Sequence, residues 1–490
     1  MKVLFVASEC APFAKTGGLG DMVAGLAKAL RRLGHDARVL IPLYSFIDRK
    51  KFGLKPAGAV CTHMGANVEH WCGLHTGLLD DEVPVWFLEY DSYFGRPGIY
   101  DGPAGHYVDN AYRFGLLSKA ALQVCKDNAW IPDAMHAHDW PSALLPVFLK
   151  TWDRILSPLS NTASVLTIHN IGYQGVYPGS VFQYIGVGTE HFTPDKFEDH
   201  GKLNLLKGGL AFADAITTVS PTHAQEILTP SGGMGLAPYL NNRIADFTGI
   251  LNGVDYEHWN PATDPHLPAQ FTPRNMAGKA KCKAALQKRM GLEVRADVPL
   301  FGIVSRFAPQ KGFSLVQVAL PAAMSTMSMQ VAVLGSGDPV TEDFFRMLSY
   351  SFPTRASAQI GFDVALSHLI EAGSDFFLMP SLYEPCGLNQ IYSLKYGTLP
   401  VVRATGGLED TVINYNEATG DGTGFKFLQP APLALQNTIG WAVSTWFDRP
   451  QHITKLRQQA MAQDFSWAKS AQQYVEVYQR ALDKKRSTPL

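Results

Sequence analysis

Short apolar runs alternate with longer segments of helical periodicity along this chain, and this alternation constrains the fold more than any other feature. In the first half, the runs that predict buried strands are residues 3–7, 37–41, 85–89, 134–138, 164–168 and 215–219. Residues 19–33 separate the first two runs and place Leu, Met and Val on one side of a helix. Strands that alternate with helices form a parallel sheet covered on both faces. The sequence therefore predicts an α/β fold.

The alternation stops and then starts again, which predicts a second α/β domain. Residues 261–273 contain four prolines in a polar context, as is typical of an interdomain linker. The further strand candidates are residues 300–305, 330–334, 376–379 and 400–402. A chain of 490 residues is also too long for one ordinary core. We expect a first domain at 1–250, a linker at 251–270, a second domain at 271–465 and a C-terminal helix within 466–490.

Composition excludes several classes of partner. Lys and Arg number 42 and Asp and Glu 43, so no basic surface for nucleic acid is expected. We find no apolar stretch of about 18 residues, and the apolar run at 3–7 is too short for a signal peptide, so no membrane partner is expected. None of the six cysteines belongs to a C-x-x-C pair, which favours reduced thiols and a cytoplasmic protein. Oligomeric state is not readable from the sequence.

A glycine-rich segment, K-T-G-G-L-G-D at Lys15–Asp21, lies between the first strand and the first helix. Glycines allow backbone N–H groups to approach a phosphate, and a helix N-terminus adds partial positive charge. Lys15 adds a full charge. The spacing matches neither a P-loop nor a dinucleotide fingerprint. On shape alone, an anion site that includes Gly18 and an ordinary strand-to-helix turn are equally compatible with it.

Polar residues follow other strands of the first half, where ligands of open parallel sheets bind. His169 ends an apolar strand and precedes a glycine-bearing loop, so its side chain is a candidate ligand contact. Asp139 follows the strand that contains His136, and we interpret Asp139 as a cleft residue and His136 as a core residue. Asn252 stands in an Asn-Gly segment, which is compatible with a sugar contact or with a tight turn.

The second half carries the charged candidates. Arg306 and Lys311 follow its first strand, and both can stabilise the negative charge of a leaving diphosphate. Glu384 follows a later strand, and a carboxylate there can stabilise positive charge that develops on a sugar. Two glycine turns provide candidate N–H donors: Cys386-Gly387-Leu388 and Thr405-Gly406-Gly407. Taken singly, an Arg or Lys in a loop is more often a surface cation, Glu384 is compatible with a solvated loop carboxylate, and Cys386 is compatible with a small packed thiol.

In combination, the motifs resemble those of bacterial glycogen synthases and plant starch synthases. The matching segments are K-x-G-G-L at Lys15, T-[IV]-H-N at His169, S-R-x-x-x-Q-K-G at Arg306 and Lys311, E-P-C-G-L at Glu384, and T-G-G-L-x-D-T-V at residues 405–412. The resemblance covers roughly residues 1–480, with the motifs in the family's order. Gly20 replaces the alanine of many bacterial members, so the product, glycogen or starch, stays open.

The resemblance implies a glycosyltransferase-B fold, in which two Rossmann-like domains face a central cleft and a C-terminal helix crosses back to the first domain. It implies transfer of glucose from ADP-glucose to the non-reducing 4-OH of an α-1,4-glucan, with retention. The implied catalytic residues are Glu384, His169, Arg306 and Lys311. The implied substrate-binding residues are Lys15, Gly18, Asp139, Asn252, Cys386, Gly387, Leu388, Thr405, Gly406 and Gly407.

No cofactor is expected, and the sequence contains no D-x-D segment of the kind that holds Mg²⁺ or Mn²⁺ at many sugar-nucleotide sites. Two alternatives remain. One is another glycosyltransferase-B enzyme with a different donor or acceptor, and donor competition separates it from a synthase. The other is a catalytically silent glucan-binding protein, which would bind glucan without releasing nucleotide. The sequence alone does not distinguish ADP-glucose from UDP-glucose.

Overall fold

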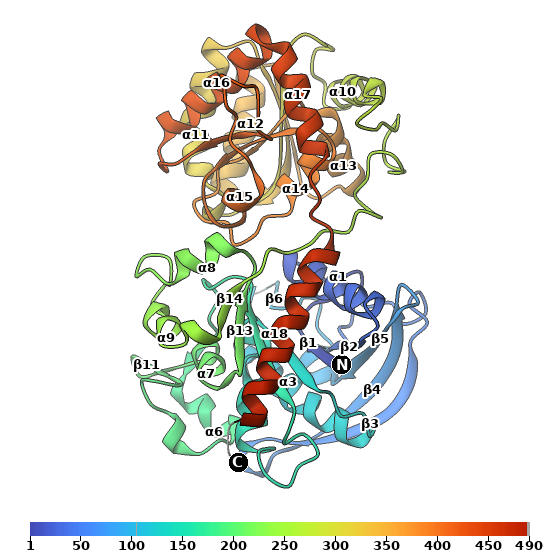
Figure 1. The fold of residues 1–490 in the computed structure, drawn as a ribbon, viewed down its shortest axis with the longest axis vertical. Coiled ribbons are helices and arrows are strands. Elements are labelled where there is room, and N and C mark those ends of the chain that lie inside the picture. Colours follow the sequence, from blue (N-terminus) through green and yellow to red (C-terminus); the bar gives the residue numbers. More distant parts are fainter. Residues whose placement is uncertain (104, 488–490) are drawn as a thin grey trace. The chain divides into compact units, whose positions relative to one another are not determined.

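The structure, a computed structural model, describes residues 1–103 and 105–487 and divides into two compact units (Figure 1). Unit 1 contains Met1–Gly253 and the chain from Trp467 onward, and unit 2 contains Val254–Ser466. Both units alternate strands with helices around a mainly parallel sheet, so the predicted α/β fold is confirmed.

The main sheet of unit 1 is parallel except at one edge. Its strand order is β14 (Phe247–Gly249), β13 (Ala215–Thr218), β9 (Ala163–Ile168), β8 (Ala134–His138), β1 (Lys2–Val6), β2 (Asp36–Pro42), β5 (Val83–Glu89), β4 (Glu69–Leu79) and β3 (Lys55–His63). Strands β3 and β4 form an antiparallel hairpin on β5. The sequence did not predict this hairpin, because β3 is largely exposed and lacks a continuous apolar run.

Helices cover this sheet and connect its strands. They are α1 (Gly18–Arg32), α2 (Asp91–Phe94), α3 (Asn110–Asp127), α4 (Asp139–Ser142), α5 (Leu144–Thr151), α6 (Phe182–Ile185), α7 (Leu205–Phe212), α8 (Pro221–Ile227) and α9 (Ala237–Asn241). Short strands outside the main sheet are β6 (Asp101–Gly102), β7 (Gly105–His106), β10 (Val176–Pro178), β11 (Glu198–Asp199) and β12 (Lys202–Asn204). The core strand β1 is buried from Val3 to Val6, as expected for a strand with covered faces on both sides.

The C-terminal helix α18 (Trp467–Ser487) packs on unit 1 against α1, β8, β9 and β13 (Figure 1). Two glycines make room for Trp467. A Cβ atom added at Gly25 would lie 2.0 Å from its Nε1, and one added at Gly253 would lie 2.6 Å from its Cα. A helix was predicted within 466–490; residues 488–490 of that range lie outside the described residues.

Unit 2 is built on a parallel sheet. Its strand order is β17 (Ala356–Ile360), β16 (Gln330–Gly337), β15 (Leu300–Phe307), β18 (Phe376–Met379), β19 (Leu399–Arg403) and β20 (Phe425–Phe427). Its helices are α10 (Ala277–Arg289), α11 (Phe313–Thr326), α12 (Pro339–Ser351), α13 (Val364–Gly373), α14 (Asn389–Lys395), α15 (Gly406–Thr411), α16 (Pro432–Asp448) and α17 (Pro450–Met461). None of the helices in the described ranges has the combined length and apolar character that a membrane span requires.

The segment 254–270, most of the predicted linker, packs within unit 2. The indole ring of Trp259 stacks on His368, with ring centroids 3.8 Å apart, and on Tyr392, with centroids 4.0 Å apart. Asp264 is buried and accepts hydrogen bonds from His368 (2.7 Å) and Tyr396 (2.5 Å). These contacts make the segment part of the unit 2 core, and the chain divides at Gly253 and Trp467.

Candidate active-site residues

A buried carboxylate holds the glycine-rich segment of unit 1. Glu9 follows β1, and its side chain accepts hydrogen bonds from the backbone N–H groups of Thr16 (2.6 Å) and Gly17 (3.3 Å) and from the Thr16 hydroxyl (2.9 Å). Tyr100 donates a further bond of 2.7 Å to the same carboxylate. Sequence reasoning missed Glu9, because no motif indicates that it turns back toward residues 16 and 17.

The two candidates on this segment have different surroundings. Lys15 is half-exposed and pairs with Asp21 in the first turn of α1, at 2.7 Å. Gly18 is the first residue of α1, so its N–H group lies at the helix N-terminus. The carboxylate of Glu9 already occupies the N–H groups of the two preceding residues. Among the N–H groups of this segment, those from Gly18 onward are therefore the ones that can meet a phosphate.

A second carboxylate holds the loop after β9. Asp139 is buried at the start of α4, and its Oδ1 accepts hydrogen bonds from the N–H groups of His169 (2.7 Å) and Asn170 (3.3 Å). Burial raises the pKa of Asp139 to about 7, although both hydrogen bonds oppose this change. Asp139 adopts a positive φ of 54°, uncommon outside glycine. The structure thus gives this predicted substrate-binding residue a positioning contact to the loop of His169.

His136, His138 and His169 contact one another in sequence next to this loop. His138 Nδ1 and His169 Nε2 lie 3.1 Å apart, and His136 contacts the Tyr478 hydroxyl of α18 at 2.8 Å. Burial lowers the pKa of His169 to about 3 and the pKa values of His136 and His138 well below the usual range. All three imidazoles are neutral at physiological pH, so His169 carries no charge there and offers one hydrogen-bond donor and one acceptor.

Asn252 has an unsatisfied acceptor. Its side chain is 4% exposed, and its Oδ1 has no hydrogen-bond partner among the described residues. A buried acceptor of this kind costs free energy unless a ligand or water donates to it. This observation favours the ligand-contact interpretation of Asn252 over the tight-turn interpretation.

The structure brings two of the three charged candidates of unit 2, Lys311 and Glu384, together. Lys311 Nζ lies 2.7 Å from Glu384 Oε2, and the Ser381 hydroxyl donates to the same oxygen at 2.8 Å. Glu384 is 5% exposed. A charge-assisted bond at this burial holds the carboxylate in one orientation. The sequence assigned the two residues separate tasks and did not predict their contact.

The remaining cation, Arg306, lies near the end of β15 and is exposed. Its guanidinium has no hydrogen-bond or ion-pair partner in the part of the chain that the structure describes. Downstream, Gly312 has a φ of 74°, and a Cβ atom there would lie 2.0 Å from the carbonyl oxygen of Pro380. This close approach packs the segment of Lys311 against the end of β18, which is how the Lys311–Glu384 contact is built.

The two glycine turns of unit 2 pack on one another. Gly407 donates its N–H to the carbonyl oxygen of Glu384 at 3.1 Å. A Cβ atom at Gly406 would lie 2.0 Å from that oxygen, and one at Gly407 would lie 2.0 Å from the carbonyl oxygen of Cys386. Thr405 is the N-cap of α15, and Leu388 is the N-cap of α14. The predicted residues 384–388 and 405–407 therefore form one packed cluster.

Two residues that the sequence did not single out support this cluster. Gln390 donates from Nε2 to the carbonyl oxygens of Cys386 and Gly387, both at 3.0 Å, and Gly387 itself has a φ of 72°. Arg403 donates to the carbonyl oxygens of Ser381 (2.9 Å) and Leu382. Both contacts run from a side chain to backbone oxygens, so no spacing of residue types reveals them.

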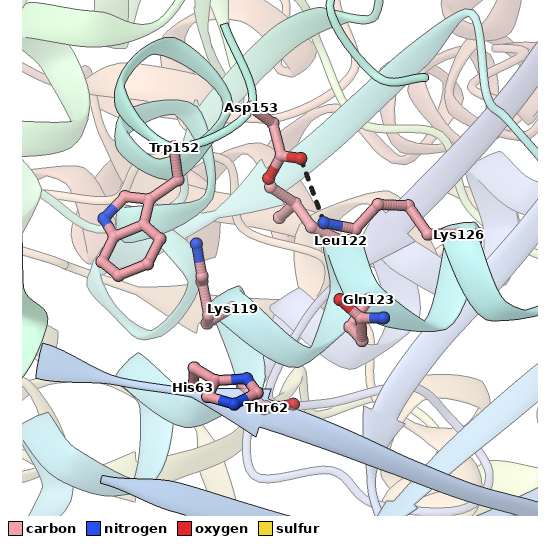
Figure 2. A pocket seen from close by; sticks show the side chains of 8 residues that line it. All are labelled: Thr62, His63, Lys119, Leu122, Gln123, Lys126, Trp152 and Asp153. Carbon is pink, nitrogen blue, oxygen red and sulfur yellow. Dashed lines mark hydrogen bonds and ion pairs between the residues drawn. The ribbon is translucent and has the colours of Figure 1, made fainter. Parts of the chain in front are cut away.

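A cavity of about 220 Å³ in unit 1 contains none of the predicted site residues (Figure 2). It is lined by Thr62, His63, Lys119, Leu122, Gln123, Lys126, Trp152 and Asp153. The ammonium group of Lys119 faces the Trp152 ring at 3.8 Å, and burial lowers the pKa of Lys119 to about 7. The candidate active-site residues must therefore be recognised from their motifs and contacts, and not from the shape of this cavity.

Comparison with known sequences identifies the family. Residues 2–242 match the family model of the starch synthase catalytic domain, and residues 287–460 match that of group 1 glycosyl transferases. Glycogen synthase 1 of Geobacter sulfurreducens is 47% identical over 488 residues, which are 99% of this chain and 97% of that protein. The chain belongs to the glycogen and starch synthase family. It is a glycosyltransferase of glycogen or starch synthesis, and the predicted resemblance is confirmed.

Two further glycogen and starch synthases agree with this assignment over nearly their full lengths. The glycogen synthase of Treponema denticola is 46% identical, with 99% of this chain and 100% of that protein covered. The catalytic domain of starch synthase IV from Arabidopsis thaliana, solved bound to ADP and acarbose, is 34% identical with a TM-score of 0.90, and 98% of this chain and 99% of that chain are covered. The predicted glycosyltransferase-B fold is thereby confirmed. Membership of the family implies a nucleotide-sugar donor and a glucan acceptor.

Proposed function

We propose that this synthase transfers glucose from ADP-glucose to the non-reducing 4-OH of an α-1,4-glucan, with retention of configuration. The observation that carries the proposal is the ion pair of Lys311 and Glu384 at the carboxyl ends of the unit 2 strands, where open α/β sheets bind ligands. The solved starch synthase IV supports the choice of nucleotide, because it was bound to ADP.

The charged groups of unit 2 have complementary tasks in this proposal. The bond between glucose C1 and the diphosphate oxygen breaks, and a bond from C1 to the acceptor O4 forms; the proton of the 4-OH passes to the leaving diphosphate. Arg306 and Lys311 stabilise the negative charge of the diphosphate. Glu384 stabilises positive charge on the sugar and orients Lys311, whose ammonium group it contacts.

The unit 1 groups that contact substrate in the proposal are uncharged donors and acceptors, apart from Lys15. In the proposal, His169 and Asn252 contact the hydroxyl groups of the transferred glucose, and the Lys15 and Gly18 segment contacts the donor. The unsatisfied Oδ1 of Asn252 supports this role, since a sugar hydroxyl would complete its hydrogen bonding. The low pKa of His169 supports a neutral hydrogen-bonding role in place of proton transfer.

Transfer by this arrangement needs no resident metal and no organic cofactor, and we propose that it proceeds without either. Arg306, Lys311 and backbone N–H groups supply the positive charge that a divalent ion supplies at carboxylate-bearing sites. We also propose a cytoplasmic location. Its support is that all six cysteines are unpaired in the described part of the chain, as is typical of a reducing compartment.

The test is to incubate the full chain with glycogen and either ADP-glucose or UDP-glucose, with a chelator present, and to measure nucleotide release and glucan elongation. Elongation from ADP-glucose supports the proposal. Elongation from UDP-glucose alone would mean that the donor is UDP-glucose. The residue roles would then still be tested by Glu384→Gln. A folded chain that elongates with neither donor contradicts the proposal and favours another acceptor or a silent glucan-binding protein.

Glu384→Gln tests the assigned chemistry. We expect kcat to fall by about 10²–10³-fold, because the neutral amide cannot stabilise positive charge or hold Lys311. A matched control is Glu342→Gln, which removes a carboxylate that pairs with Arg346 at 3.1 Å on α12. Turnover of the Glu384 variant within a few-fold of the control variant would remove Glu384 from the mechanism.

A further inference from the structure

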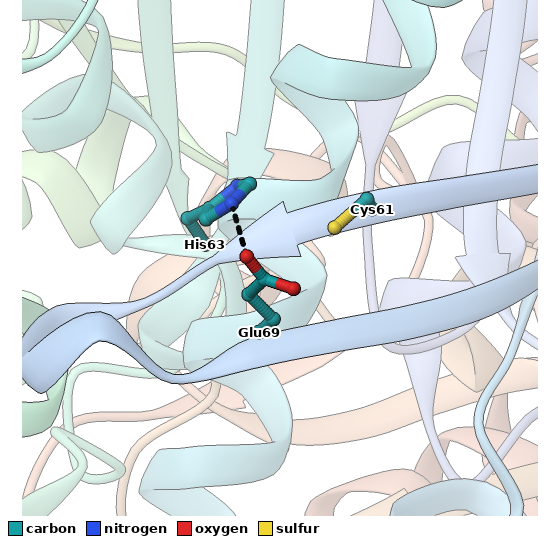
Figure 3. A group of neighbouring side chains, drawn as sticks. All are labelled: Cys61, His63 and Glu69. Atoms are coloured by element: carbon teal, nitrogen blue, oxygen red, sulfur yellow. Dashed lines mark hydrogen bonds and ion pairs between the residues drawn. The ribbon is translucent and has the colours of Figure 1, made fainter.

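A cysteine, a histidine and a glutamate meet on the outermost hairpin of unit 1 (Figure 3). Cys61 and His63 alternate along β3, and Glu69 of β4 is the direct antiparallel partner of His63. Alternate residues of a strand and their directly opposite partners share one face of a sheet. The three side chains therefore project from the same face, and their Sγ, imidazole nitrogen and carboxylate oxygen atoms all lie within 4.8 Å of one another.

This set of ligand atoms matches the chemistry of one class of metal ion. Thiolate, imidazole and carboxylate are the side chains that bind Zn²⁺, whereas Mg²⁺ and Ca²⁺ require oxygen ligands. Bond lengths of about 2.0–2.3 Å place two ligand atoms of a tetrahedral site about 3.3–3.7 Å apart. His63 Nε2 and Glu69 Oε1 are already 3.1 Å apart, so the approach still needed is between this pair and the Cys61 sulfur, by up to about 1.5 Å.

The side chains have room for this movement. The side chains of His63 and Glu69 are 57% and 56% exposed. His63 also borders the cavity of Figure 2, so its imidazole is not packed against a neighbour on that side. Figure 3 shows the sulfur of Cys61 directed toward the Glu69 carboxylate. Cys61 is partly buried, so the exposed side chains of His63 and Glu69 rotate toward its sulfur to close a site around an ion.

The local electrostatics favour a cation. The Glu69 carboxylate, which lies beside Cys61, and the nearby carboxylate of Asp127 place negative potential at the Cys61 sulfur. This negative potential attracts a metal ion, which displaces the thiol proton when it binds. The positive charge of Lys126, on the neighbouring cavity wall, is balanced by Asp153 at 3.0 Å.

We propose that Cys61, His63 and Glu69 bind a divalent ion of the zinc class, with water in the fourth position. Binding releases one proton from the Cys61 thiol and replaces the direct His63–Glu69 hydrogen bond with two bonds to the ion. The site does not depend on the proposed glucosyl transfer, since it contains none of the residues assigned to that reaction. A bound ion would link the edge strand β3 to β4 next to the turn that joins them.

A metal site predicts bound zinc and a cobalt–thiolate absorption, neither of which the His63–Glu69 hydrogen bond alone would give. Chelator-treated full-length chain, reduced with a phosphine, is dialysed against Zn²⁺, and bound metal is counted per chain. Co²⁺ is then used as a spectroscopic substitute, because a cobalt–thiolate bond produces a charge-transfer absorption. The other cysteines, Cys10, Cys72, Cys125, Cys282 and Cys386, are buried, so Cys61 is the expected source of the absorption.

Cys61→Ser and His63→Gln test the ligands, and His106→Gln is the matched control. His106 and Asp101 form another exposed pair, 2.9 Å apart and 54% and 64% exposed, on the β6–β7 hairpin, and they belong to no group of three metal-binding side chains among the described residues. We expect one Zn²⁺ per chain in the parent and in His106→Gln. Zinc affinity should fall at least about 10-fold in Cys61→Ser and His63→Gln, and the cobalt absorption should be absent from Cys61→Ser.

Several results overturn the proposal. They are the absence of zinc binding to the parent chain, unchanged zinc affinity in Cys61→Ser, and an equal loss of affinity in His63→Gln and His106→Gln. Far-ultraviolet circular dichroism of each variant shows that the fold is retained, as expected for substitutions of partly exposed side chains.

Discussion

The chain contains the tetrapeptide T-G-G-L twice, once in each unit, and the two copies are held in different ways. In unit 1, residues 16–19 are tethered by the Glu9 carboxylate, which accepts from Thr16 and Gly17. In unit 2, residues 405–408 are pressed against backbone oxygens of the loop 384–386. The glycines differ accordingly. Gly17 has φ −159° and open space around a Cβ position, whereas Gly406 has φ +44° and none.

The same tetrapeptide therefore does not need its glycines for the same reason in the two units. The unit 1 turn depends on a side-chain acceptor, and the neighbouring loop of His169 depends on another, Asp139. The unit 2 turn depends on the absence of side chains. Substitution of the tethering carboxylate should therefore loosen the unit 1 turn, and substitution of a glycine should disrupt the unit 2 turn.

Gly407→Ala should give the largest effect. Its Cβ atom would lie 2.0 Å from the backbone oxygen of Cys386, and backbone cannot rotate away as a side chain can. We expect the free energy of unfolding of unit 2 to fall by more than about 3 kcal/mol. Urea denaturation followed by tryptophan fluorescence measures this change. A loss below about 0.5 kcal/mol would show that the two turns tolerate side chains equally.

Asp139→Asn should make the stability of unit 1 less dependent on pH. Because the pKa of Asp139 is raised from 3.8 to about 7, the folded state binds more protons than the unfolded state in this interval. The parent chain therefore loses stability as pH rises from 5 to 8, by about 3 kcal/mol from this group. The asparagine variant lacks this loss. Urea denaturation of both proteins at pH 5 and pH 8 measures the free energy of unfolding. An equal change with pH in the parent and the variant would contradict the assigned pKa.

Glu9→Gln should loosen the first turn. The amide keeps one oxygen acceptor but presents an NH₂ group to donors that the carboxylate accepted, at a cost of about 1–3 kcal/mol. We expect faster hydrogen exchange at the amides of Thr16 and Gly17 and a higher KM for the sugar nucleotide. Unchanged exchange at both amides would mean that the turn holds its shape without this carboxylate.

Gly17→Ala should give the smallest effect on stability. An extended φ of −159° suits any residue, and nothing lies within 4 Å of the added Cβ atom. The free energy of unfolding should change by less than about 0.5 kcal/mol. A loss as large as that of Gly407→Ala would remove the distinction between the two turns.

The sequence predicted the α/β alternation and the family motifs because both depend on residue types at fixed spacing. It did not predict the contact of Lys311 with Glu384, since 73 positions separate them and tertiary packing, including that of Gly312 on Pro380, brings them together. Glu9 and Gln390 were missed for a related reason. Each acts by a side-chain bond to backbone groups, and any sequence in the bonded segment presents the same groups.

The hairpin of β3 and β4 was missed for a different physical reason. Strand β3 is an edge strand with several exposed residues, so it lacks the apolar run that marks a strand covered on both faces. The predicted linker at 251–270 was inferred from its prolines. Trp259 within it nevertheless stacks between His368 and Tyr392, and an indole in such a stack belongs to a core.

The placement of Trp467 between Gly25 and Gly253 has a consequence for synthesis on the ribosome. Unit 2 is continuous in sequence, so it is complete once Ser466 has left the exit tunnel. Unit 1 begins first but is completed after unit 2, because α18 follows unit 2 along the chain. Until then the indole ring of Trp467, which packs on Gly25 and Gly253, and the Tyr478 hydroxyl, which contacts His136 Nδ1, are missing. The first half of the nascent chain therefore lacks part of its core packing until the whole of the second domain has been synthesised.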